Sequence, residues 1–236
     1  DDGLGFYGPG GVGDNNQYRV WYRSTAETSY SNGDDVTVLT DQSGNGNDAN
    51  APSGNEPTFD DPGVNNRPSI NFNAANNDYF DIADTDDLNT ADGAQRERSF
   101  VTAFVTGADV STRQTIFEEG GGTRGLNIYL ENDSVYVGGW NLTNSDEYYW
   151  GYTYKSAPVN VNTEYYVILE LDADTTFSPD STFKGYINGS EMTNGVNRDA
   201  GPIWPHAGDV RLGGNESAVY ADGATDGNLN LFEGEL

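Results

Sequence analysis

Residues 40–49 read TDQSGNGNDA, residues 70–73 read INFN and residues 77–82 read NDYFDI. Glycine, asparagine and aspartate form tight turns because they accept positive φ angles or hydrogen-bond their own backbone. The two shorter segments alternate apolar and polar residues, which is the pattern of half-buried β-strands. This block therefore predicts two turns between strands of an antiparallel β structure, and it indicates architecture rather than catalysis.

The same alternation recurs along the rest of the chain, with turn residues at regular spacing between the apolar segments. Strands are expected at 18–22, 36–39, 69–72, 79–82, 99–105, 115–117, 125–130, 134–138, 147–155, 165–171, 183–187 and 210–214, with turns at 118–122 and 188–189. No segment shows a helical period of useful length. We expect an all-β fold, a two-sheet antiparallel β-sandwich of the jelly-roll type.

The 236 residues contain no internal repeat, which favours one large β domain. Residues 1–17 are rich in glycine and are predicted to be a linker or N-terminal arm, whereas residues 18–236 form the domain. We find no run of about 20 apolar residues that would span a membrane, and no signal peptide. The chain begins with Asp1 and not with Met, so we expect a mature or trimmed piece of a longer product.

The chain is strongly acidic. Its 38 Asp and Glu residues and 11 Lys and Arg residues give a net charge of -27, and the acids are spread along the sequence. Such a field repels nucleic acid and anionic membranes, so we expect neither a nucleic-acid partner nor membrane insertion. Two explanations are open: adaptation to a salty medium that screens the charges, or Asp-rich loops that bind Ca²⁺. The absence of cysteine excludes disulfides, cysteine-based zinc sites and a cysteine nucleophile.

A series of motifs in a fixed order carries a family resemblance. They are Trp21, Asp41-x-Ser43-Gly44-x-Gly46-Asn47-Asp48, Phe72-Asn73, Asp78-Tyr79-Phe80, Ser99-Phe100-x-Thr102-Ala103-Phe104, residues 183–189 and Arg211-Leu212-Gly213-Gly214. Over residues 18–236 the chain resembles the laminin G-like domains of the concanavalin A-like lectin/glucanase superfamily, especially those of large secreted surface proteins of Bacteroidetes-type bacteria. The resemblance implies two stacked sheets, often a Ca²⁺ ion at the rim, an extracellular or cell-surface location, and a role in binding sugars or proteins.

The end of the chain departs from this family. Family members usually close with a Phe-x-Gly motif followed by an acidic, apolar last strand. Residues 231–236 (LFEGEL) begin that pattern and then stop. The resemblance thus predicts a sandwich that lacks its last strand in this chain, either because the chain is a fragment or because a partner supplies the strand by β-augmentation.

The Asn/Asp-rich turns are the best candidate for a metal site, because Ca²⁺ takes six to eight oxygen ligands from carboxylates, amides and backbone carbonyls. The candidate ligands of a structural Ca²⁺ ion are Asp41, Asn45, Asn47, Asp48 and Asp78. In the alternative interpretation, Asp41 and Asn47 hydrogen-bond their own backbone and the neighbouring glycines only supply positive φ angles. A second, weaker acidic cluster lies at residues 84–87.

An aromatic strand is the candidate ligand-binding surface. Tyr148, Trp150, Tyr152 and Tyr154 alternate along residues 147–155, so they are expected to share one face. One alternative is that these rings fill the core; the other is a platform on which sugar rings stack. Buried tyrosine hydroxyls need hydrogen-bond partners, which makes a row of three demanding inside a core. Trp140 and Asn141 precede this strand and are expected at the rim of the platform.

Catalysis has a weaker signature. Glu170, Asp172 and Asp174 share one face of a predicted strand, and retaining glycosidases use two carboxyl groups about 5 Å apart. The related hydrolase pattern also requires a further Glu, where this chain has Thr175-Thr176. We therefore predict that the domain is not an enzyme. His206, the only histidine, is expected in a surface loop.

These observations predict a non-catalytic extracellular recognition module of a cell-surface adhesin that binds a polysaccharide or surface glycan. Neighbouring domains of the same large protein are further candidate partners. One alternative is a carbohydrate-binding module of a polysaccharide-degrading enzyme. Another is a structural subunit of a surface fibre that is completed by strand exchange.

Overall fold

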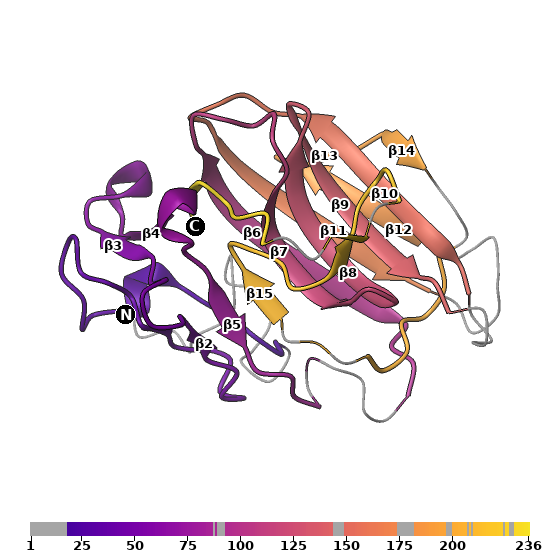
Figure 1. Ribbon diagram of the computed structural model, residues 1–236, viewed down its shortest axis with the longest axis horizontal. Helices are drawn as coiled ribbons and strands as arrows, with labels where there is room; N and C mark the ends of the chain where they lie inside the picture. Colours follow the sequence, from indigo (N-terminus) through magenta and orange to yellow (C-terminus); the bar gives the residue numbers. More distant parts are fainter. Residues whose placement is uncertain are drawn as a thin grey trace.

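The computed structural model describes residues 18–86, 88, 93–143, 149–173, 182–196, 200–206, 208, 210–223, 225–226 and 229–236. Within these residues two large antiparallel sheets enclose one apolar core, which confirms the predicted β-sandwich. In Figure 1 the first third of the chain, in indigo and purple, lies on one side of the molecule. The long strands of the middle of the chain lie on the other side, and the C-terminal end lies beside the purple segment.

One sheet has nine strands, all paired with antiparallel neighbours. In spatial order they are β1 (Val38–Leu39), β2 (Ala49–Asn50), β5 (Phe80–Ile82), β15 (Val210–Leu212), β7 (Gln114–Gly121), β8 (Arg124–Glu131), β9 (Ser134–Asn141), β10 (Gly151–Pro158) and β14 (Asn194–Val196). The Asn/Asp turn at 40–48 joins β1 to β2 at one edge of this sheet.

The other sheet has seven strands. In spatial order they are β13 (Ser190–Glu191), β12 (Thr182–Ile187), β11 (Glu164–Asp172), β6 (Glu97–Thr106), β18 (Gly234–Glu235), β4 (Ser69–Phe72) and β3 (Thr58–Asp60). A small third sheet pairs β16 (Ala218–Val219) with β17 (Thr225–Asp226). The helices of the described chain are single 3₁₀ turns, η3 (Ser24–Ala26), η4 (Val64–Asn66) and η5 (Ala74–Asn76), and none is long and apolar enough to cross a membrane.

Strand β11 illustrates how the alternation of apolar and polar residues gives a sheet one buried face. Its buried residues alternate with more exposed ones along the strand, because successive side chains point to opposite faces of a sheet. The hairpin from β12 to β13 turns at Asn188 and Gly189, which have φ angles of 49° and 79°. Positive φ at both positions is what a two-residue hairpin turn requires, so this predicted turn is confirmed.

Aromatic residues from distant parts of the sequence hold β18 in the middle of its sheet. The ring of Phe232 lies 6.0 Å from Phe72 and 6.2 Å from Phe104, measured between centroids, and it is fully buried. Phe72 belongs to β4 and Phe104 belongs to β6, so the ring of Phe232 fills the core between these two strands. Its burial anchors the two residues of β18 between β4 and β6.

Two local predictions are wrong. Residues 18–22 form no strand; the backbone N–H of Trp21 donates instead to the carboxylate of Asp41. The turn expected at 118–122 begins later, because β7 continues to Gly121 and pairs with β8 along its length. Residues 118–120 are buried inside β7, so their polar and glycine-rich sequence does not mark the end of the strand.

Candidate functional site

Gly151 divides the aromatic segment between two faces of the nine-stranded sheet. It has a φ of +73°, a left-handed conformation that interrupts the alternation of side chains at the start of β10. Trp150 therefore enters the core between the sheets, where only 4% of its surface is exposed. Its indole N–H donates to the carbonyl oxygen of Pro202 at 3.4 Å. The prediction that Trp150 shares a face with Tyr152 and Tyr154 is wrong, and Tyr148 lies outside the described residues.

Tyr152 and Tyr154 do share a face, which is the outer face of the nine-stranded sheet. Their ring centroids are 5.8 Å apart, and Tyr154 lies 5.7 Å from Tyr136 of β9. Tyr136 in turn stacks on Tyr129 of β8, with centroids 4.8 Å apart and planes inclined by 10°. We call these four residues the tyrosine stripe. Tyr136, Tyr152 and Tyr154 are partly exposed, whereas Tyr129 is fully buried.

Residues 215–223, which we call the cover segment, lie over the strands next to the stripe. The ring of Tyr220 meets that of Tyr129 edge to face at 4.8 Å. The hydroxyl of Tyr129 accepts a hydrogen bond of 3.0 Å from the backbone N–H of Ala221. The hydroxyl of Tyr152 lies 3.5 Å from that of Tyr129. Burial raises the pKa of both of these tyrosines, so both hydroxyls stay protonated and can donate.

Charged side chains form one border of the stripe. The guanidinium of Arg113 lies over the ring of Tyr220, 4.1 Å from its centroid. Arg113 also makes ion pairs of 2.8 Å with Glu131 and with Asp222. Glu131 and Asp222 are partly or fully exposed. The border thus offers fixed charges and carboxylate oxygens beside partly exposed aromatic rings.

The sheet beneath the cover segment holds a buried carboxyl group. Glu118 of β7 is fully buried, and burial raises the pKa of its carboxyl to about 8. Its Oε2 accepts a hydrogen bond of 2.9 Å from the backbone N–H of Glu216. The residue opposite on β8 is Asn127, whose amide N–H donates to the carbonyl of Val219 at 2.9 Å. These two bonds fasten the cover segment to the sheet.

Trp140 and Asn141, predicted to lie at the rim of a platform, are both fully buried. The indole N–H of Trp140 donates to the carbonyl of Gly121 at 2.8 Å, and its ring packs with the cover segment and Tyr129. Asn141 lies at the end of β9, opposite Gly151. Neither side chain presents surface that a ligand could contact, so their role is to support the stripe from below and beside it.

The predicted calcium loop is held by hydrogen bonds from protein donors. Asp41 is buried, and its Oδ1 accepts from the backbone N–H groups of Trp21 and Ser43, both at 2.9 Å. Its Oδ2 accepts from the Ser43 hydroxyl at 2.6 Å and from the backbone N–H of Asn47 at 3.1 Å. Asp48 accepts from the backbone N–H of Asp41 at 2.8 Å. These contacts match the alternative in which Asp41 organises its own loop.

The amide groups of the same loop also bond to protein. The side-chain N–H groups of Asn45 and Asn47 both donate to the carbonyl of Arg19, at 3.1 Å and 2.8 Å. The side-chain oxygen of Asn47 accepts from the hydroxyl of Thr85 at 2.9 Å. These bonds tie the loop to Arg19 in the segment 18–22 and to Thr85.

Asp78 has a different environment. Its Oδ2 accepts a hydrogen bond of 2.8 Å from the backbone N–H of Asn73, at the other end of the same turn. Burial raises its pKa, and the charges of Asp35 and Glu56 raise it further. In the described part of the chain no three acidic or histidine side chains converge in a way that could hold a metal ion. Calcium binding by the predicted residues stays a prediction, and a bound ion would have to displace the protein donors around Asp41.

Glu170 and Asp172, whose spacing resembles that of glycosidase carboxylates, lie on the outer face of the seven-stranded sheet. Glu170 is paired across the strands with Lys184 and accepts from the hydroxyl of Tyr186 at 3.4 Å. Asp172 is exposed opposite Thr182, and Asp174 lies outside the described residues. Glu170 and Asp172 thus stand on an open sheet surface.

His206 is not the surface residue that the sequence predicts. Its side chain is only 2% exposed, and its Nε2 lies 3.4 Å from Oε1 of Glu119. Glu119 also pairs with Arg98, which reaches it from β6 across the core. The three residues form a buried polar cluster between the sheets.

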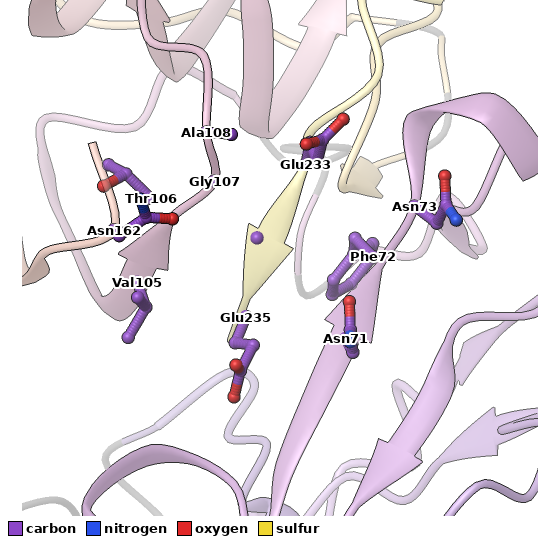
Figure 2. Close-up of a pocket in the computed structure, with 11 residues that line it drawn as sticks. Asn71, Phe72, Asn73, Val105, Thr106, Gly107, Ala108, Asn162, Glu233 and Glu235 are labelled. Carbon is purple, nitrogen blue, oxygen red and sulfur yellow. The ribbon is translucent and has the colours of Figure 1, made fainter.

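A hollow of about 410 Å³ lies over β18. Figure 2 shows it between β6 and β4, with Glu233 and Glu235 at the two ends of the short strand and Asn71 and Asn73 along one side. Asn162 and Thr106 border the other side. The two residues of β18 pair with β6 on one side of the hollow and with β4 on the other.

No family model and no curated protein sequence matches the chain. Among solved structures it is similar to the binding domain of Paraclostridial Mosquitocidal Protein 1, with a TM-score of 0.54 and 11% identity over 87% of this chain and 46% of that one. The chain thus spans about half the length of that domain, and the likeness shows a shared β fold.

Two further similar structures are more distant. The ligand-binding domain of botulinum neurotoxin serotype D, solved in complex with N-acetylneuraminic acid, has a TM-score of 0.48 and 12% identity over 77% of this chain and 41% of that one. The endo-β-1,4-glucuronan lyase of the fungus Trichoderma reesei has a TM-score of 0.38 and 13% identity over 91% and 88%.

The site that sequence reasoning missed comes from three strands and one distant segment. Tyr152 and Tyr154 were predicted, but Tyr129, Tyr136 and Arg113 were not. Tyr129 and Tyr136 flank the turn of a predicted hairpin, so pairing that hairpin residue by residue would have brought their rings together. The contact between Arg113 and Tyr220 joins residues over a hundred positions apart, so no local sequence pattern predicts it.

Proposed function

We propose that this domain is a non-catalytic recognition module that binds a glycan through the tyrosine stripe. The observation that carries the proposal is the row of partly exposed rings at Tyr136, Tyr152 and Tyr154 on one face of a sheet. Tyrosine combines a flat apolar surface with a polar tip, so it suits ligands that present both C–H groups and hydroxyls. Sugars have this mixed character.

The border of the stripe supplies the polar part of recognition. Arg113 is held over Tyr220 by its ion pairs with Glu131 and Asp222, so these charges keep fixed positions beside the rings. Their carboxylate oxygens can accept hydrogen bonds from sugar hydroxyls. The chain carries a net charge of -27, which disfavours anionic sugars. The preferred ligand class is therefore a neutral glycan.

The same proposal includes the location of the module and the larger protein to which it belongs. The module is extracellular or at the cell surface, as part of an adhesin, where a surface glycan or polysaccharide is its partner. A carbohydrate-binding module beside a catalytic domain would use the stripe in the same way. The open sheet surface around Glu170 supports a binding role over a hydrolytic one, because hydrolysis of a glycosidic bond needs carboxyl groups held on both sides of it.

A glycan array with the purified chain tests the proposal. We expect a neutral oligosaccharide to bind, and Tyr154→Ala and Tyr136→Ala to weaken its binding at least about tenfold while the melting temperature stays close to that of the parent. Tyr166→Ala is the matched control, because Tyr166 is 44% exposed on the other sheet. Equal binding by the stripe variants and the parent, or selective binding of anionic sugars, would contradict the proposal.

A further inference from the structure

The hollow over β18 is separate from the tyrosine stripe. It lies on the seven-stranded sheet, whereas the stripe lies on the outer face of the other sheet. Its volume of about 410 Å³ is at the low end of the range for ligand pockets, which is about 300–1,000 Å³. The hollow therefore suits a small ligand, of about the size of one sugar ring or one amino-acid side chain.

Backbone contacts on both sides fix the position of Glu233 at one end of the hollow. Its backbone N–H donates to Oε1 of Gln114 at 3.0 Å, and its carbonyl accepts from the N–H of Gly107 at 2.9 Å. Glycine is needed at position 107 for this approach, because an added Cβ would lie 2.6 Å from the carbonyl oxygen of Glu233. Figure 2 shows Glu233 beside Gly107, at the end of the hollow opposite Glu235.

The hollow carries negative charge and lacks positive charge. Glu233 is exposed, and its carboxylate has no hydrogen bond or ion pair with any of the described residues. Glu235 is partly exposed, and its Oε2 accepts from the Ser69 hydroxyl at 2.6 Å, which leaves Oε1 open. No basic residue is among the described residues that line the hollow. A ligand with a positive charge and N–H donors therefore complements it, and the net charge of -27 favours the approach of cations.

Three asparagine side chains line the same hollow and add uncharged hydrogen-bonding groups. Oδ1 of Asn73 accepts from the backbone N–H of Ala75 at 2.9 Å, so its side-chain N–H groups stay available as donors. Nδ2 of Asn71 donates to Asp60 at 3.0 Å, so its side-chain oxygen stays available as an acceptor. Asn162 makes no side-chain hydrogen bond with the described residues and offers both kinds of group. Hydroxyl groups, which donate and accept, match this mixture.

We propose that this hollow is a second binding site, for an amino sugar with a protonated amine. The ammonium group pairs with the Glu233 carboxylate, and the ring hydroxyls bond to the asparagine side chains and to Oε1 of Glu235. This site goes beyond the glycan binding proposed for the tyrosine stripe, and neither site depends on the other. The stripe takes a neutral glycan on aromatic rings, whereas the hollow takes a cationic sugar among carboxylates and amides.

Two other cationic occupants fit the hollow less well. A metal ion is held by several converging ligands, and in the described part of the chain no three acidic or histidine side chains converge in that way. A lysine side chain would bury its apolar stem along an apolar wall. The apolar side chains of the lining are those of Phe72, Val105 and Ala108, and Phe72 is only 1% exposed. The polar lining therefore favours an amino sugar over a basic peptide.

The test titrates the protein with glucosamine in mildly acidic solution and follows the backbone amides by NMR. Sodium chloride at about 0.15 M reduces the screening length to about 8 Å, so the net charge of the protein does not attract every cation. Glucose and N-acetylglucosamine keep the sugar ring and lack the positive charge, whereas methylammonium keeps the charge and lacks the ring. Nα-acetyl-lysine amide represents a basic peptide.

We expect glucosamine to move the amide signals of Gly107, Ala108 and Gly234 in a saturable way, with a dissociation constant of the order of millimolar. Each of the other four probes should bind at least about fivefold more weakly. Glu233→Gln should weaken glucosamine binding about fivefold and leave the response to glucose unchanged. Glu191→Gln is the matched control, because Glu191 is exposed at the edge of the same sheet and its loss changes the net charge equally.

An equal response to glucosamine and glucose would mean that the charge is not recognised. Equal or tighter binding of the lysine derivative would assign the hollow to a basic peptide, and equal binding of methylammonium would leave no role for the ring. An equal loss in Glu191→Gln and Glu233→Gln would show only a general attraction by net charge. Signals that move at Tyr152 and Tyr154 instead of Gly107 would place the sugar on the tyrosine stripe. Each of these results, like the absence of any saturable shift, overturns the proposal.

Discussion

The outer faces of the two sheets are built differently. On the nine-stranded sheet, β7 and β8 are buried along nearly their whole length, because the core covers one face and the cover segment the other. On the seven-stranded sheet, β11 alternates between buried and more exposed residues. A strand loses its simple alternation when a second layer covers its outer face, and its polar residues then need partners in that layer.

The two faces also differ in what their exposed residues can do. The covered face leaves Tyr136, Tyr152 and Tyr154 partly exposed beside the fully buried Tyr129. The bare face exposes Val101 and Tyr166 beside an open strand edge. The first holds aromatic rings in place by packing, whereas the second leaves part of the β6 backbone without a neighbouring strand among the described residues.

The largest expected difference between the faces concerns two tyrosines. Tyr129→Ala on the covered face removes a fully buried ring that packs on Tyr136 and Tyr220. We expect it to lower the free energy of unfolding by about 3–5 kcal/mol. Tyr166→Ala on the bare face removes a ring that is 44% exposed, so a loss below about 1 kcal/mol is expected. Urea unfolding of both variants measures the difference. Similar losses would mean that the cover segment does not bury its face in solution.

Sequence reasoning located long strands in both sheets but failed within β7 of the covered face. Alternation located β4 at its observed bounds and β11 within one residue at each end, because each of these strands has one buried face. It ended β7 too early, at Phe117, because the glutamates and glycines that follow were interpreted as a turn. The residues that bury Glu118 lie about a hundred positions away, so no local pattern could reveal its setting.

The candidate site was predicted in part for the same reason. The alternation of side chains along a strand correctly predicted that Tyr152 and Tyr154 share a face. It also placed Trp150 on that face, which is wrong. The positive φ of Gly151 breaks the period between them, and a glycine within a strand does not by itself show which conformation it takes. Trp140 was expected at a rim and is buried, because the cover segment closes over it.

A second test of the covered face uses the charge of Glu118. Burial raises the pKa of its carboxyl to about 8, so the folded protein holds a proton that the unfolded chain releases near the ordinary glutamate pKa of 4.5. A raised folded pKa means that this stabilisation is complete below about pH 4.5 and is lost as the pH rises toward 8. Within that window the loss is at most about 1.4 kcal/mol per pH unit.

Glu118→Gln keeps the shape and removes the ionisation. We expect the stability of this variant, relative to the parent, to increase between pH 5 and pH 8.5, as measured by urea unfolding at both values. The amide also provides a donor beside the side-chain oxygen of Asn127, which has no partner in the described structure. A difference that stays constant with pH would show that Glu118 is accessible to water, and the covered face would then be open.

The smallest expected effect tests whether the edge of the nine-stranded sheet needs a metal ion. The loop between β1 and β2 is organised by Asp41, whose two carboxylate oxygens already accept four hydrogen bonds from Trp21, Ser43 and Asn47. A Ca²⁺ ion bound there would have to compete with those donors for the same oxygens. We therefore expect EDTA to shift the melting temperature by less than about 1 °C, and added Ca²⁺ to have no further effect.

The matched variant Asp41→Ala should lower the melting temperature clearly, because it leaves buried N–H groups without acceptors. A fall in melting temperature with EDTA that Ca²⁺ reverses, and that Asp41→Ala abolishes, would instead assign this edge to a calcium ion.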